Sequence, residues 1–387
     1  MRLRRTSPSC VAGSAINSRR HIDPIGVLYS PASMRVQWLL DRRTTGEDWS
    51  SRNASSEWQD DAIRAATRNF TRAIEHSGLQ HRFVSTEEVK RGDLRGGRYR
   101  ILMLPHTIAL SATEAKEIRA FVEQGGTVLA EGEPGVFDEH GRRMAKPSLS
   151  EVLPTLAANA TTGFAFGKGS AIYSAFPDDR GRDSERPIME ILETAGVRPR
   201  FPLFQTDGGS TRDVETHIFD NGGVTVVALQ RDFHAAVDAE SIPNSRETVA
   251  VMLPHTYHVY DLRGGRSLGN TDHLMLELGP VEPVLLALSE KPLTPLSISG
   301  PREARLGSNA EFLIHSDAAA ASDVVHLDVI DPEGNTVAHY SGNLFVTRGA
   351  GSKLLPFAFN DKPGIWTIRA RDLLNGATAS AELKVER

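Results

Sequence analysis

The stretch that decides the fold class is residues 101–130, ILMLPHTIALSATEAKEIRAFVEQGGTVLA. Its first four residues, Ile101 to Leu104, are all apolar, which is typical of a strand covered on both faces of a parallel sheet. Ser111 and Glu114 form a capping box that predicts a helix over 112–124, and a glycine pair followed by a second apolar run ends the stretch. A strand, a helix and a strand in this order predict a right-handed crossover between parallel strands.

The same alternation continues on both sides of this stretch. Further strands are predicted at 25–29, 82–85 and 169–174, and further helices at 56–76, where Ser56 and Gln59 form a second capping box, and at 187–194. We therefore expect an α/β doubly wound domain, flavodoxin- or amidotransferase-like, over residues 24–198. Residues 1–23 are rich in arginine and serine and are expected to be a disordered tail.

After residue 198 the pattern becomes purely β. Short alternating runs predict an antiparallel β domain over 199–291, and Asp220-Asn221-Gly222-Gly223 is a strong hairpin signal. Beyond a proline-rich linker, seven short strand patterns, one of them at 336–340, fit an immunoglobulin-like β-sandwich over 292–387. The expected fold class is thus an α/β doubly wound domain followed by two all-β domains, the last immunoglobulin-like.

Composition excludes several classes of function. The 387 residues carry a net charge of −5, which leaves no broad basic surface for nucleic acid. The single cysteine, Cys10, excludes an internal disulfide and any cysteine-based zinc cage. No run approaches 18 apolar residues, so no membrane partner is expected, and without a recognisable signal peptide the expected location is cytoplasmic.

Polar side chains gather after two of the predicted strands. His106 follows one, and Glu131, Glu133, Asp138, Glu139 and His140 follow the next. Because the loops after parallel strands meet at one edge of a sheet, these groups could supply a metal site or a pair of acid–base carboxylates. Loop histidines held by local hydrogen bonds, and carboxylates that cap helices or close turns, are the alternative interpretation. No catalytic, cofactor-binding or metal-ligating residue is assigned.

Two further features of the first domain have competing interpretations. Trp38 and Trp49 lie near Arg52 and other arginines, a combination that suits a sugar- or partner-binding surface but also ordinary core packing. Residues 163–170, GFAFGKGS, nearly spell a phosphate-binding loop. Their spacing is one residue short, however, and glycine replaces the hydroxyl residue after Lys168, so a tight turn entering a strand is favoured.

Several motifs together resemble a known family. They are GVLYSPAS at 26–33, the spacing of Trp49 and Arg52, YRILMLP at 99–105, LSATEA at 110–115, FVEQGGTV at 121–128, PGVFDEHG at 134–141 and GKGSAIY at 167–173. In this order they resemble the β-galactosidase trimerisation domain of glycoside hydrolase family 42, over about residues 24–198. VYDLR at 259–263 resembles, more weakly, the β-rich segment that follows in such proteins.

The resemblance implies a scaffold without its own chemistry. In that family the catalytic carboxylates lie in an upstream (β/α)8 barrel, and only 23 residues precede the α/β domain here. The related amidotransferase fold uses a cysteine, which residues 129–134 do not contain. We therefore expect a non-catalytic oligomerisation or accessory portion of a β-galactosidase-like glycoside hydrolase in carbohydrate metabolism.

The resemblance also implies partners. We expect no cofactor, and either a homo-oligomer, a trimer by resemblance, or an upstream barrel-bearing chain as partner. Two alternatives remain open. One is a carbohydrate- or ligand-binding module, and the other is a residual hydrolase that uses the loop carboxylates.

Overall fold

The computed structural model describes residues 18–42, 62–154, 161–173, 186–209, 211, 214–231, 246–317 and 319–387. The chain divides into two compact units, one formed by Ile22–Arg200 and the other by Phe201–Arg387 together with Met1–His21. No helix in the described part of the chain is long and apolar enough to cross a membrane.

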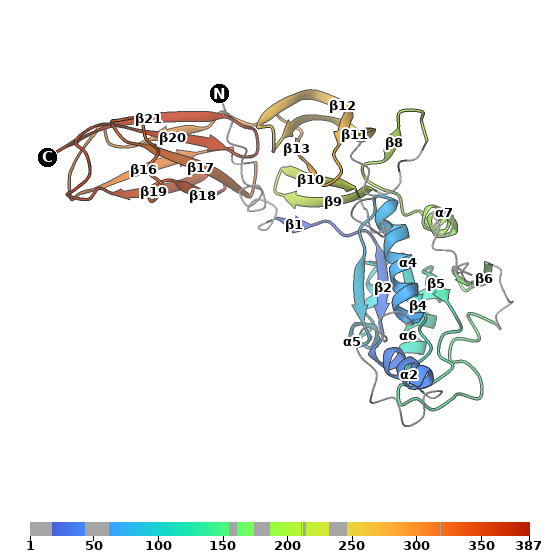
Figure 1. Ribbon diagram of the computed structural model, residues 1–387. Coiled ribbons are helices and arrows are strands. Elements are labelled where there is room, and N and C mark those ends of the chain that lie inside the picture. The colour runs from blue at the N-terminus through green and yellow to red at the C-terminus, as the bar shows by residue number, and fades with distance from the viewer. Residues whose placement is uncertain are drawn as a thin grey trace. The chain divides into compact units, whose positions relative to one another are not determined.

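The first unit is built on one mixed sheet with strand order β3-β2-β4-β5-β7-β6 (Figure 1). Neighbouring strands from β3 to β7 are parallel, whereas β6 pairs antiparallel with β7. The strands are β2 (Ile25–Tyr29), β3 (Arg82–Ser85), β4 (Ile101–Pro105), β5 (Thr127–Glu131), β6 (Thr162–Phe166) and β7 (Gly169–Tyr173). The helices are α2 (Pro31–Arg42), α4 (Ala62–His76), α5 (Thr86–Lys90), the 3-10 helix η2 (Asp93–Gly96), α6 (Ala112–Glu123) and α7 (Arg186–Thr194).

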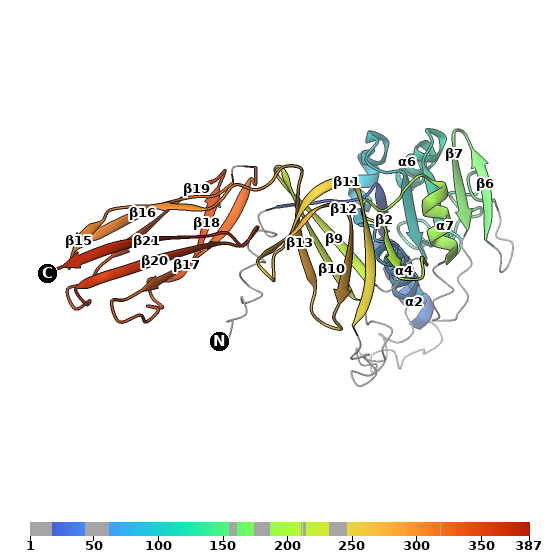
Figure 2. The ribbon, with the colours of Figure 1, turned by 90° about the horizontal axis from the view of Figure 1, so that it is seen from above.

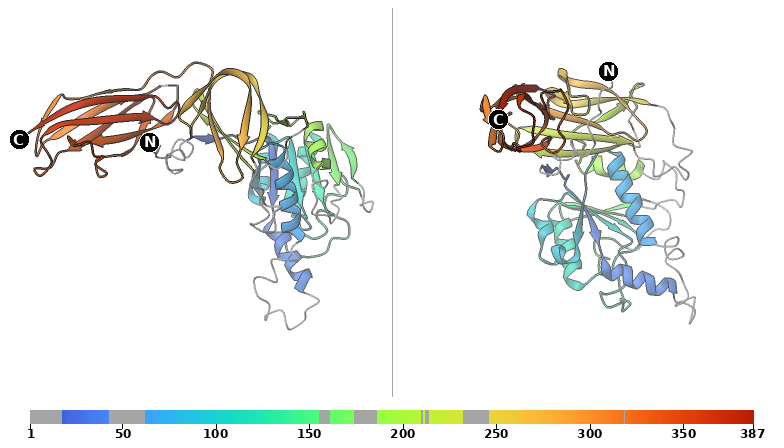
Figure 3. Two further views of the ribbon diagram at one scale, coloured as in Figure 1. Left: turned by 45° about the horizontal axis from the view of Figure 1, so that its top comes forward. Right: turned by 60° about the vertical axis from the view of Figure 1, so that its left-hand side comes forward.

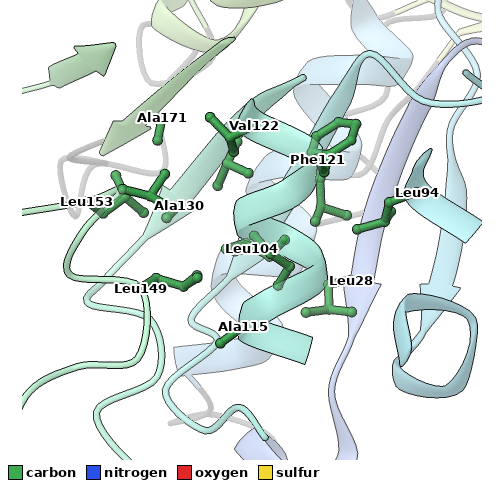
Figure 4. Close-up of a cluster of buried hydrophobic side chains, with 14 of the residues drawn as sticks. Leu28, Leu94, Leu104, Ala115, Phe121, Val122, Ala130, Leu149, Leu153 and Ala171 are labelled. Atoms are coloured by element: carbon green, nitrogen blue, oxygen red, sulfur yellow. The ribbon is translucent and has the colours of Figure 1, made fainter. Parts of the chain in front are cut away.

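The buried side chains of this sheet alternate between two apolar clusters, because successive residues of a strand point to opposite faces. In β4, Leu102 and Leu104 pack with α6, and Figure 4 shows this cluster around Phe121 and Val122. Ile101 and Met103 join the other cluster, with α4 and α7. Figure 3, right, shows α4 and the α5–α6 region on different sides of the sheet.

The expected α/β doubly wound domain, and with it the flavodoxin- or amidotransferase-like description, is wrong. The protein is mostly β, with 46% strand and 18% helix, and its strands form three sheets. A doubly wound sheet requires a crossover helix between successive parallel strands. No helix is described between β5 and β6, and β6 and β7 form an antiparallel hairpin closed by Gly167 and Lys168. This hairpin also agrees with the tight-turn interpretation of 163–170.

Most local predictions in this unit are confirmed. The capping box of Ser111 and Glu114 starts α6. Of the predicted helix 56–76, the part from Ala62 to His76 is helical, whereas Ser56 and Gln59 lie outside the described residues. Residues 1–17 of the expected tail also lie outside the described residues, but Arg19–Arg20 form strand β1, which pairs with β9.

In the second unit, one sheet has the strand order β1-β9-β10-β13-β11-β12, with β8 on β11. The strands are β8 (Leu203–Gln205), β9 (Val214–Asn221), β10 (Val224–Arg231), β11 (Glu247–Asp261), β12 (Arg266–Leu278) and β13 (Val284–Ser289). The hairpin predicted at 220–223 is confirmed, since Asn221 pairs with Val224 across the two glycines. The long strand β11 pairs with β12 along its length, with an irregularity between Met252 and Tyr257.

The other sheet of this unit has the order β14-β16-β19-β18-β17-β20-β21-β15 (Figure 2). Its strands are β14 (Ser297–Ser299), β15 (Glu303–Arg305), β16 (Asn309–His315), β17 (Ser322–Ile330), β18 (Gly342–Thr347), β19 (Ala350–Pro356), β20 (Gly364–Asp372) and β21 (Thr378–Glu386). Trp366 packs edge-on against Tyr340 and Phe357 in its core. The strand predicted at 336–340 is absent from the described structure, and β15 and β18 were not predicted. The immunoglobulin-like assignment stays a prediction.

Candidate functional site

The edge of the first sheet at which the parallel strands end gathers three polar side chains. His106 directly follows β4, Glu131 ends β5, and Gln37 lies on α2. The His106 Nδ1 atom is 3.1 Å from Glu131 Oε2, and its Nε2 atom is 3.1 Å from Gln37 Oε1. Both ring nitrogens are therefore occupied by neighbouring side chains, and the imidazole links α2 to the sheet.

The backbone at this point adopts two uncommon conformations. His106 has φ of 42° and Gly132 has φ of 72°, a region that side-chain-bearing residues rarely occupy. A β-carbon at Gly132 would lie 3.2 Å from His106 Nδ1, so a larger residue there would crowd the imidazole where it meets Glu131. Such local strain persists only where surrounding contacts enforce it, and here the two side-chain contacts of His106 do so.

The two serine hydroxyl groups that follow β2 are also held in hydrogen bonds within the protein. Ser30 Oγ donates to Ser33 Oγ at 2.9 Å, and Ser33 Oγ donates to the Ala109 carbonyl at 3.1 Å. The Ala109 amide in turn donates to Ser33 Oγ at 3.0 Å. These buried serines fasten the start of α2 to the loop after β4, and neither hydroxyl contacts the imidazole in a described hydrogen bond.

Beside these polar groups lies a hollow of about 600 Å³ between α2, α4 and the sheet edge, which we call the edge hollow. Tyr29, Met34 and Phe83 line it although their side chains are 49%, 37% and 47% exposed. Arg68 and Thr71 of α4 contribute its polar wall, and Leu28 and Pro105 lie deeper. Three apolar side chains exposed around one concavity make the edge hollow a candidate surface for apolar contact.

The structure places the predicted site residues in different surroundings. Trp38 lies on α2 and is 38% exposed, whereas Trp49 and Arg52 lie outside the described residues. His106 joins the edge described above, and its described side-chain hydrogen bonds go to Glu131 and Gln37 rather than to Glu133, Asp138 or His140.

The Asp138 carboxylate accepts backbone hydrogen bonds within a surface turn. Its Oδ1 atom accepts the backbone amides of His140 at 2.9 Å and Arg142 at 2.8 Å. The amide of Arg142 is the largest cause that lowers the pKa of Asp138, so this carboxylate is ionised and unsuited to act as a general acid.

At the end of β7, burial and then the Glu133 charge raise the pKa of Tyr173 to about 12. Within the described ranges, no group of three or more His, Cys, Asp or Glu side chains could hold a metal ion.

Sequence reasoning missed the α2 contribution to this edge. Ser30-Pro31 carries the relevant signal, because serine is favoured at a helix N-cap and proline at the first helical position. With α2 in place, Ser33 and Gln37 fall one helical turn apart on the side that meets the sheet.

A second hollow, of about 820 Å³, lies in the β sheet of the second unit, among β11, β12 and β13. Its charged groups are paired across it: Arg246 with Glu277 at 3.2 Å, and Arg263 with Glu282 at 3.6 Å. Because the arginines already have carboxylate partners, this hollow gives no distinct charge pattern for a ligand to complement.

Comparisons with known proteins give structural neighbours only. No family model and no curated protein matches the chain. Solved structures that it resembles include a GH42 β-galactosidase from G. stearothermophilus (15% identity, TM-score 0.48) and β-galactosidases from Bacillus circulans sp. alkalophilus (13%, 0.48) and Rahnella sp. R3 (13%, 0.46). The alignments cover 70%, 71% and 69% of this chain, but only 40%, 42% and 41% of those chains. The match therefore spans well under half the length of these structures.

Proposed function

We propose that this chain is a non-catalytic, oligomerising accessory portion of a β-galactosidase-like glycoside hydrolase. The motif series within residues 24–198 supports the link to that family. The observation that carries the proposal is the edge hollow, where Tyr29, Met34 and Phe83 are exposed together. At the same edge, His106, Glu131, Ser30 and Ser33 are held in hydrogen bonds to their neighbours. The edge hollow therefore suits apolar contact with a partner better than nucleophilic chemistry.

The partner we propose for the edge hollow is a second copy of this chain. Burying apolar surface contributes roughly 25 cal/mol per Å², so three half-exposed large side chains supply a useful part of an interface core. Arg68 at the margin provides the kind of polar rim that surrounds such a core. The motif resemblance implies a closed assembly, a trimer, rather than an open chain of copies.

Light scattering at tens of micromolar tests this function. We expect the wild-type chain to have the mass of an oligomer and the Phe83→Asp variant to be a monomer, because a carboxylate in the apolar contact is desolvated without a partner. The matched control is Phe345→Asp on β18, since Phe345 is also exposed, at 57%, but lies far from the edge hollow in sequence and in another unit. A monomeric wild type, or equal masses for all three proteins, contradicts the proposal.

Carbohydrate binding is the second candidate function, and the rings of Tyr29 and Phe83 in the edge hollow favour it. Aromatic faces offer apolar contact to a sugar ring, and Arg68 lines the same hollow. The hydroxyls of Thr67 and Thr71 donate to the carbonyls of Ile63 and Arg68 within α4. Calorimetry with galactosides distinguishes the two functions. Saturable heat that Phe83→Ala abolishes supports sugar binding, whereas absence of heat in the wild type removes it.

A further inference from the structure

The C-terminal sheet carries two aspartates on its inner face. Asp323 lies near the start of β17 and Asp372 at the end of β20, and both are only 1% exposed. In the ladder between these strands Val325 is opposite Asp372, so Asp323 is two residues further along the same face. The strand alternation that buries Leu327 and Val329 therefore turns both carboxyl groups toward the core as diagonal neighbours.

Backbone amides donate hydrogen bonds to some, but not all, of the oxygens of these two carboxyl groups. Asp323 Oδ1 accepts the Val324 amide at 2.6 Å, and Asp372 Oδ1 accepts the Leu374 amide at 2.7 Å. Asp323 Oδ2 is buried and has no hydrogen-bond partner among the described residues. An ionised carboxylate only accepts, whereas a protonated one also donates, so a proton on Asp323 would satisfy this oxygen by donation to its neighbour.

Among the described residues, no basic side chain is a cause of the pKa shift of either carboxyl. Asp317, before β17, is a third acid, and its carboxylate accepts the amides of Thr294 and Ala319. Next to Asp323 in the sheet is Val346 of β18, and the backbone partner of Asp372 is Ala377. The basic groups of β17 and β20, His326, Arg369 and Arg371, belong to the opposite face by alternation.

The remaining elements near this end of the sheet present neutral groups to it. Arg348 of the β18–β19 turn contributes its backbone amide, to the Ala321 carbonyl. The β9–β10 hairpin contributes the Asn221 side chain, whose amide nitrogen donates to the Ser322 carbonyl at 2.6 Å and whose oxygen accepts the Ser322 amide at 2.9 Å. The Gly223 amide donates to the Ala319 carbonyl at 2.6 Å. This hairpin and the start of β17 are thus joined immediately beside Asp323.

We propose that Asp323 and Asp372 share a proton, and that loss of this proton at alkaline pH loosens the start of β17 and its hydrogen bonds to the β9–β10 hairpin. The device lies in the second unit and is independent of the edge hollow. Its ligand is the proton itself.

The direction of the pH dependence follows from burial. Burial, and then the neighbouring Asp372 carboxyl, raise the pKa of Asp323, against the lowering effect of the Ser316 hydroxyl and the Val324 amide. Burial likewise raises the pKa of Asp372, against the lowering effect of the amides of Leu374 and Asn375. A carboxyl whose pKa is higher in the folded than in the unfolded chain stabilises the fold fully below its unfolded pKa. That contribution is lost as pH rises through the folded pKa, so stability falls from acidic toward alkaline pH.

Calorimetric unfolding of the full chain between about pH 5 and pH 9 tests whether the shared proton stabilises the second unit. We expect the transition of the second unit to move down by several degrees as pH rises. In Asp323→Asn, a neutral amide of the same shape donates to Asp372, so the transition is expected to lose most of this pH dependence and to lie above wild type at pH 9.

The control is Asp331→Asn. Asp331 lies in the turn after β17, where it is 9% exposed and its Oδ2 atom accepts a hydrogen bond from Lys362 Nζ at 3.0 Å. The Asn335 amide is the largest cause that lowers its pKa, so this carboxylate stays ionised over the tested pH range and the variant should keep the wild-type slope. Parallel pH curves for wild type and Asp323→Asn overturn the proposal. A carbon-detected NMR titration of aspartate carboxyls in the wild type needs no variant: one carboxyl titrating above about pH 6 is expected, and all titrating in the ordinary acidic range also overturns it.

Discussion

At the residue scale, the clearest stabilising feature that the sequence predicts is the capping box of α6. Ser111 Oγ accepts the Glu114 amide at 3.2 Å, and Glu114 Oε2 accepts the Ser111 amide at 2.9 Å. Both residues are buried, so Ser111→Ala leaves polar groups without partners out of reach of water. We expect a loss of about 1–2 kcal/mol in the free energy of unfolding, measured by urea denaturation of the first unit. Thr113→Ala, an exposed change on the same turn, should stay within about 0.5 kcal/mol; equal losses would contradict the cap's role.

Residue-level prediction succeeds where partners are close in sequence and fails where they are far apart. Ser111 and Glu114 are three residues apart, and the helical repeat fixes their meeting. His106 meets Gln37 across 69 residues and Glu131 across 25, and those contacts depend on where α2 packs. The pairing of Asp323 with Asp372 depends on the register of β17 against β20, which no local pattern specifies.

At the element scale, the hairpin β6–β7 packs closely against the end of α6 because Gly169 has no side chain. A β-carbon on Gly169 would collide with the carbonyl oxygens of Gly126 and Val122. Backbone atoms cannot rotate away, so Gly169→Ala should force the hairpin from α6 and cost roughly 1–3 kcal/mol, seen as a lower thermal midpoint of the first unit. On the same hairpin, Gly163→Ala meets only Ile172 at 3.7 Å and should be nearly neutral. A neutral Gly169→Ala would show that the packing is looser than described.

Element types could be predicted more fully than their connections. The apolar runs of β2, β4 and β5 and the turn signal at Gly222-Gly223 identify strands and a hairpin, because burial and turn chemistry act locally. The same reasoning assumed that each strand of the first unit is followed by a crossover helix. The chain after β5 instead enters a hairpin, and the pairing of Thr127 in β5 with Ser170 in β7, 43 residues apart, is not encoded in any short segment.

At the scale of the whole molecule, the apolar cores of the two units are separate. Phe70 lies in a cluster formed within residues 25–197, and Phe312 in one formed within 296–385. Both side chains are fully buried. Among the described residues, each apolar cluster draws its buried members from a single unit, so the two units should unfold as separate cooperative transitions.

Truncation of one core side chain in each unit distinguishes separate from joint unfolding. Phe70→Ala and Phe312→Ala each remove a buried ring, which costs about 3–5 kcal/mol where it occurs. In calorimetry of the full chain we expect Phe70→Ala to lower the midpoint of one transition and Phe312→Ala that of the other, with the second midpoint unchanged in each case. The Asp323→Asn variant then identifies the second unit's transition independently, through its altered pH dependence. If either truncation moves both midpoints together, the two cores are energetically coupled and the chain unfolds as one cooperative body.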